Sequence, residues 1–96
     1  MGSPNKEEEK IVMDLLRLVP KENQAIISEG EILRGAQNLS HRTGIKFAAA
    51  CAGFLLALPC NMDFDLSIEN VAEAIGSPPR KIRLAVHYAR KYYQSG

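Results

Sequence analysis

The sequence predicts an all-α fold, a compact orthogonal bundle of five helices in a single domain over residues 1–96. Apolar residues recur at intervals of three and four along most of the chain, as they do on one side of an α-helix. No stretch alternates β-branched with polar residues, and no Asn-Gly or Asp-Gly pair marks a hairpin. The 96 residues, of which 46% are hydrophobic, suffice for one core and leave no room for a second domain.

The first predicted helix covers about residues 5–18, and Pro20 ends it because proline cannot continue a helix. Residues 1–4 are expected to be either disordered or vector-derived. The second helical region covers about residues 22–39 and is expected to break near Gly30, because glycine weakens a helix interior by about 1 kcal/mol relative to alanine. A turn is expected over residues 40–44.

The third predicted helix, about residues 45–58, is apolar on every side and has one charged residue, Lys46, at its start. A helix without a polar face is predicted to lie in the middle of a bundle. Its apolar run is shorter than the roughly 20 residues that span a bilayer. Because no signal peptide precedes it either, we expect an intracellular protein that has no membrane partner, nuclear in a eukaryote and otherwise cytoplasmic.

The fourth and fifth predicted helices form a helix-turn-helix. Ser67 is expected to cap the fourth helix, residues 68–75, and Gly76 to make the tight turn that follows it. The fifth helix is expected to begin at Pro79, since proline is favoured at the first helical position, and to extend to Tyr93. Residues 61–65 are expected to form a loop.

The fifth helix carries a stripe of basic side chains. At about 100° per residue, one half of the helix is apolar and comprises Ile82, Ala85, Val86, Ala89, Tyr92 and Tyr93. The other half, at spacings of three and four residues, comprises Arg80, Arg83, His87, Arg90, Lys91 and Gln94, and Lys81 adds a further cation. The net charge of +1 excludes a domain that is basic all over, but the acids lie elsewhere in the chain.

The position of these charges indicates an anionic partner. Arg80, Lys81 and Arg83 lie at the N-terminal end of the helix, where the helix dipole disfavours cations, whereas Arg90 and Lys91 in the last turn suit it. Nucleic-acid phosphate is the partner we favour. Two alternatives to nucleic acid remain: an acidic protein surface as the partner, or a solvated face that has no partner.

Nothing in the sequence predicts an enzyme. The two histidines, His41 and His87, lie on different predicted elements, and there is no metal-binding or phosphate-loop motif. The two cysteines, Cys51 and Cys60, are too few for a disulfide-stapled scaffold and are interpreted as buried apolar residues. We therefore expect no cofactor, no metal ion and no small-molecule substrate.

From Gly35 to Tyr93 the chain resembles the cyclin-box fold, in particular one core repeat of transcription factor IIB-like proteins. The resemblance lies in the alanine-rich run from Phe47 to Ala52, the short helix ending in Gly76, and the last helix ending in aromatic residues. It implies a helix-turn-helix that contacts DNA, with Arg80, Lys81 and Arg83 at the start of the contacting helix. Repeats of that family usually come in pairs, whereas this chain has one; single versions occur in the smallest subunit of the origin recognition complex.

We therefore expect a domain of a transcription or replication factor that binds double-stranded DNA. Arg80, Lys81 and Arg83 would approach a groove, and His87, Arg90 and Lys91 would follow phosphates. The alternative is a protein–protein interaction module, a cyclin-like adaptor, that holds a partner peptide or helix in a groove flanking the third helix or on the same basic face.

Overall fold

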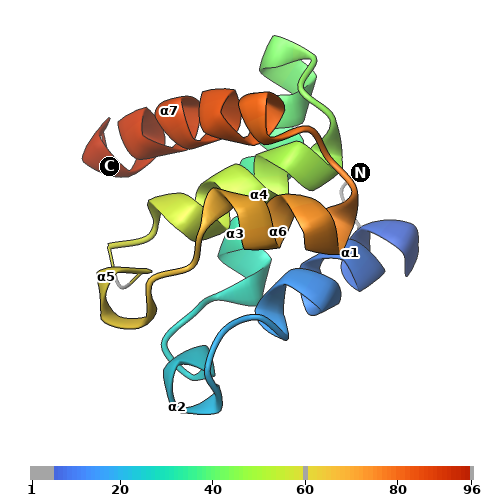
Figure 1. Ribbon diagram of the computed structural model, residues 1–96. Coiled ribbons are helices and arrows are strands. Elements are labelled where there is room, and N and C mark those ends of the chain that lie inside the picture. Colours follow the sequence, from blue (N-terminus) through green and yellow to red (C-terminus); the bar gives the residue numbers. More distant parts are fainter. Residues whose placement is uncertain (1–5, 60, 96) are drawn as a thin grey trace.

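Five helices of eight or more residues and two single-turn helices make up the described part of the chain, residues 6–59 and 61–95, in a computed structural model (Figure 1). The longer helices are α1 (Lys6–Leu16), α3 (Glu29–Thr43), α4 (Phe47–Ala57), α6 (Ile68–Ile75) and α7 (Pro79–Ser95). The short helices are α2 (Lys21–Gln24) and α5 (Asn61–Phe64). These residues contain no strand, which confirms the all-α prediction. The radius of gyration of 11.9 Å is that of a compact domain of this length.

α4 is the central helix, as its uniformly apolar sequence predicts. It contacts each of the other long helices, and α7 lies across it in Figure 1. Residues 49–56 of α4 are all buried. The side chains that pack around them come from every long helix of the domain and include Leu15, Ala36, Val71 and Ile82. The core is therefore a single cluster built around one buried helix.

The backbones of α4 and α7 approach closely where Gly53 faces Ala85. A Cβ atom placed on Gly53 would lie 2.6 Å from the carbonyl carbon of Ala85 and 2.5 Å from its Cβ. These distances are far inside van der Waals contact, so only glycine fits at this crossing. Gly35 of α3 has a related role, because a Cβ there would lie 2.7 Å from the ring of Phe54.

We expect Gly53→Ala to lower the free energy of unfolding by about 2–3 kcal/mol, because the added methyl group overlaps the backbone of α7, which cannot move aside as a flexible side chain would. Urea denaturation followed by circular dichroism measures this loss. The matched control is Gly30→Ala in α3, where an added Cβ meets no atom within 4 Å. The control should be neutral or stabilising by up to about 1 kcal/mol. Equal stability of the two variants would contradict the close crossing.

The second helical region differs from its prediction in the position of its break and at its C-terminal end. The break lies at residues 25–28, upstream of Gly30, because the Ser28 side chain accepts the backbone N–H of Glu31 at 3.2 Å and starts a new helix. α3 then continues through Thr43, so most of the predicted turn over residues 40–44 is helical. Gly44, in the left-handed conformation at φ 79°, ends the helix instead.

The predicted loop at residues 61–65 contains the single turn α5. The Asn61 side chain donates a hydrogen bond to the carbonyl oxygen of Leu56 at 3.3 Å and accepts one from the backbone N–H of Leu66 at 3.0 Å. These two bonds join the end of α4 to the approach to α6. They therefore hold α6 in place against the central helix.

The boundaries of α6 are those predicted from its capping residues. The Ser67 side chain accepts the backbone N–H of Asn70 at 3.1 Å, and Gly76 ends the helix in the left-handed conformation at φ 67°. α7 begins at Pro79, as predicted, but continues to Ser95, two residues beyond the predicted end. The two helices contact one another and both contact α4.

Candidate nucleic-acid interface

The basic stripe of α7 is exposed along its whole length. The exposed residues of this stripe, which we call the basic face, are Arg80, Arg83, His87, Arg90, Lys91 and Gln94. Residues that alternate with them, such as Ile82, Ala85 and Ala89, are buried against the core and orient the helix. At 1.5 Å per residue, the cations from Arg80 to Lys91 span about 16 Å. Lys81 is exposed too, but it lies on the flank of the helix.

The sequence of α7 contains no Asp or Glu among its cations. Within the described residues, no carboxylate lies within ion-pair distance of Arg80, Lys81, Arg83 or Arg90. Like charges such as those of Arg80, Arg83 and Arg90 repel each other on one face of the helix, and an external anion would relieve that repulsion. The basic face is therefore suited to a polyanion.

The helix dipole explains fewer of these charges than the sequence suggested. Because α7 extends to Ser95, its last turn contains no cation, and Arg90 and Lys91 lie before it. Arg80 and Lys81 lie in the first turn, where the N-terminal end of the dipole is positive. None of the α7 cations is therefore placed where the helix itself favours positive charge.

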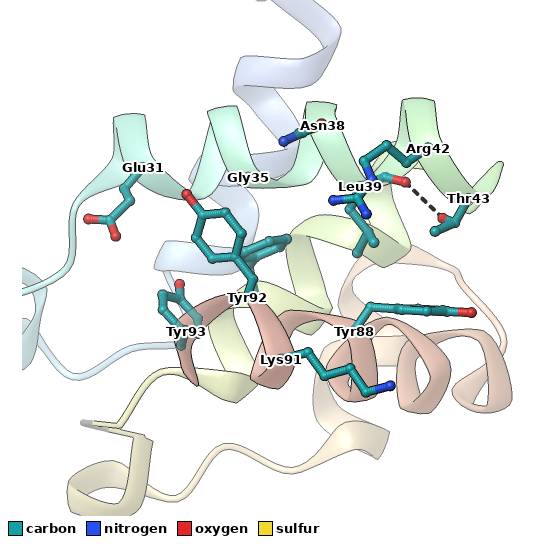
Figure 2. A pocket seen from close by; sticks show the side chains of 11 residues that line it. Glu31, Gly35, Asn38, Leu39, Arg42, Thr43, Tyr88, Lys91, Tyr92 and Tyr93 are labelled. Atoms are coloured by element: carbon teal, nitrogen blue, oxygen red, sulfur yellow. Dashed lines mark hydrogen bonds between the residues drawn. The ribbon is translucent and has the colours of Figure 1, made fainter. Parts of the chain in front are cut away.

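A groove of about 890 Å³ lies beside the basic face, between α3 and α7 (Figure 2). Phe54 of α4 is part of its lining, packed edge-to-face against Tyr92 at a centroid distance of 5.1 Å. Tyr88 and Tyr92 of α7 are 37% and 45% exposed. We call this feature the α3–α7 groove. Lys91 belongs both to the basic face and to the lining of this groove.

The charged residues of the α3–α7 groove lie apart from one another. In Figure 2, Glu31 lies at one end and Arg42 and Thr43 lie at the other. Tyr92 and Tyr93 lie toward the Glu31 end, and Tyr88 lies opposite Arg42 and Thr43. Arg42 and Glu31 are both exposed. Thr43 donates a hydrogen bond from its hydroxyl to the carbonyl oxygen of Leu39 at 2.7 Å. One end of the groove is thus basic and the other acidic.

Sequence reasoning offered a groove flanking the third predicted helix as an alternative but did not name its residues, and it assigned Tyr92 to the apolar half of α7. The Tyr92 ring does contact Phe54, but nearly half of its side chain is exposed. Tyr88 and Arg42 were not predicted as site residues. An exposed tyrosine at position 88, four residues before Tyr92, is the signal that could have directed attention to this side of the helix.

The remaining candidate groups lie apart from one another. His41 and His87 are exposed on α3 and α7, and Cys51 is buried in α4. Burial raises the pKa of the Cys51 thiol, and the Glu8 carboxylate adds to the rise. A thiol in this environment is a poor nucleophile. Cys60 lies outside the described residues. Among those that are described, no group of three or more His, Cys, Asp or Glu residues is arranged to hold a metal ion.

Comparisons with known proteins add no identification. Neither a family model, nor a curated protein, nor a solved structure matches the chain. Within the described residues, no helix combines the length and the apolar character needed to cross a membrane.

Proposed function

We propose that this domain binds double-stranded DNA through α7, the second helix of a helix-turn-helix formed with α6. The observation that carries the proposal is the exposed basic face on a helix whose sequence contains no Asp or Glu, and which begins in the first turn of that helix. A surface that serves only for solvation needs no such segregation of charge. The cyclin-box-like arrangement and a role in transcription or replication, which the resemblance implies, are part of the same proposal.

The dimensions of α7 suit the major groove of DNA. An α-helix with its side chains is about 10–12 Å in diameter, and the major groove is about 12 Å wide. Arg80, Lys81 and Arg83 at the start of the helix would approach the base edges and nearby phosphates. His87, Arg90 and Lys91 would then contact backbone phosphates, with α6 supporting the helix from behind.

A protein–protein interaction module is the second candidate function. The observation that favours it is the set of exposed apolar or aromatic side chains on α7, which comprises Leu84, Tyr88 and Tyr92. Exposed aromatic residues are enriched where proteins bind one another. An acidic partner peptide in the α3–α7 groove, or an acidic surface against the basic face, would use these residues without any nucleic acid.

Titration of a labelled duplex at several salt concentrations tests the proposed function. We expect log–log plots of the binding constant against salt to have a slope of about −3 to −5, as for release of counterions from four to six phosphates. Arg90→Gln should reduce the magnitude of that slope by about one without changing sequence preference, because a phosphate contact carries no sequence information.

The control for this titration is Lys21→Gln, which removes an exposed cation from α2, far from α7 in Figure 1. Its slope should equal that of the wild type. Absence of duplex binding at low salt would reject the proposed function. The same basic residues should then be tested for binding to acidic proteins.

A further inference from the structure

We propose that the α3–α7 groove binds an unpaired nucleotide of a DNA single strand that adjoins the duplex held by the basic face. This inference rests on the proposed function and adds a second ligand to it. It assigns the domain to junctions between double-stranded and single-stranded DNA rather than to duplex alone. The groove and the basic face share Lys91, so the two sites are continuous on the surface of α7.

Aromatic side chains provide the stacking surface that a base requires. Tyr88 and Tyr92 lie one turn apart on the same side of α7, and both are exposed at the groove. Bases stack on aromatic side chains without regard to sequence because every base has a π-face. Phe54 packs edge-to-face against Tyr92 and Tyr93 at centroid distances of 5.1 and 5.6 Å, which holds the inner part of the aromatic surface rigid.

The charge distribution in the groove fits a nucleotide laid along it. Arg42 at one end can hold a phosphate, as a guanidinium group does. At the opposite end, the Glu31 carboxylate can accept hydrogen bonds from the amino or imino groups of a base. Between these ends, Asn38 offers both a donor and an acceptor.

The length of the groove agrees with this ligand. Glu31 and Arg42 are eleven residues apart on α3, which corresponds to about 16 Å along the helix axis. That distance accommodates a nucleotide together with its flanking phosphate. The carboxylate at one end also argues against a uniformly acidic peptide that filled the groove, because Glu31 would repel it at that end.

Binding of three labelled probes tests the inference: a blunt duplex, the same duplex with a short oligothymidine extension of either polarity, and oligothymidine alone. We expect the extension to tighten binding of the wild-type chain by about tenfold, the effect of stacking one base. Tyr88→Leu should remove that gain and leave blunt-duplex affinity unchanged, because Tyr88 lies outside the basic face. Tyr88→Phe should retain the gain, because the ring remains.

Arg42→Gln should also reduce the gain from the extension, whereas Arg34→Gln should not. Arg34 is the matched control because it is an exposed arginine of α3 that does not line the groove. Iodouracil placed in the extension and irradiated should cross-link to Tyr88 or Tyr92, which peptide mapping by mass spectrometry identifies. Circular dichroism of each variant verifies that the helices are retained.

The outcomes separate this inference from the proposed function. If blunt duplex binds and the extension adds nothing, or if the gain survives both Tyr88→Leu and Arg42→Gln, the groove assignment is overturned. If oligothymidine binds in a Tyr88-dependent way and duplex does not, the groove assignment is supported and the proposed function is overturned. If an acidic, aromatic-containing peptide needs Tyr88 and Arg42 while DNA binding does not, the groove is a peptide site and the inference is overturned.

Discussion

Replacement of Ala50 by aspartate should leave the chain unfolded at room temperature. Ala50 is 0% exposed at the centre of α4, and no buried polar or charged side chain lies in the described core to pair with a new carboxylate. Burying an unpaired charge costs several kcal/mol, which is comparable with the total stability of about 5–15 kcal/mol typical of a small domain. Far-ultraviolet circular dichroism should show the loss of most helical signal.

Ala74→Asp is the control for this substitution. It makes the same chemical change on an exposed position of α6, where the carboxylate remains in water. Its helical signal should be retained and its melting temperature should fall by only a few degrees, since a carboxylate in the last turn of a helix costs about 0.3–1 kcal/mol. A folded Ala50→Asp protein with the stability of Ala74→Asp would contradict the central position of α4.

Charge reversal of Arg80 and Arg83 to glutamate should weaken duplex binding by at least about a hundredfold at low salt. Each substitution replaces an attraction to phosphate with a repulsion at the end of α7 proposed to approach the groove. Anisotropy of a labelled duplex measures the loss. The melting temperature should be unchanged or slightly higher, because both side chains are exposed and glutamate near a helix N-terminus favours the dipole.

The matched control reverses Lys6 and Lys10, two exposed cations of α1, and so changes the net charge of the chain by the same amount. Its DNA affinity should fall by a small factor only, since these residues lie on α1 and not on the basic face of α7. Equal losses for the two double variants would mean that net charge, rather than the basic face, governs binding. A fall in melting temperature confined to the Arg80 and Arg83 variant would indicate a structural role for these residues.

Helix boundaries could be predicted wherever the residues that determine them lie within a few positions of the boundary. Ser67 and Gly76 cap α6 at the positions expected, because both caps depend on local hydrogen bonds and backbone conformation. The predicted break in the second helical region was misplaced because the prediction relied on Gly30 as a helix breaker. Ser28 and Glu31 have the Ser-x-x-Glu spacing of a capping box, which marks the actual start of α3. Gly44 was likewise a local signal for the end of α3.

The candidate site likewise has one part that could be predicted from the sequence and one part that could not. The basic face follows from the period of one helix, so its exposure could be predicted from the sequence of α7 alone. The α3–α7 groove could not be, because its walls come from helices more than thirty residues apart, each positioned by its packing on α4. Gly35 and Gly53 determine how closely α3 and α7 approach α4. The periodicity of apolar residues along a helix does not predict the distance between two helices.

The segregation of charge along this chain has a kinetic consequence. With a net charge of +1, the whole domain has little long-range attraction for DNA, but seven acids precede Arg34 and five cations follow Pro78. Four Lys and Arg residues also precede Arg34, so that segment has a net charge of −3 and the last one of +5, which gives the domain an electric dipole with α7 toward its positive end. The field of a polyanion would rotate the domain before contact, so that encounters begin with α7 foremost. Orientation of this kind raises the fraction of collisions that lead to binding. The orienting effect weakens as added salt shortens the Debye length.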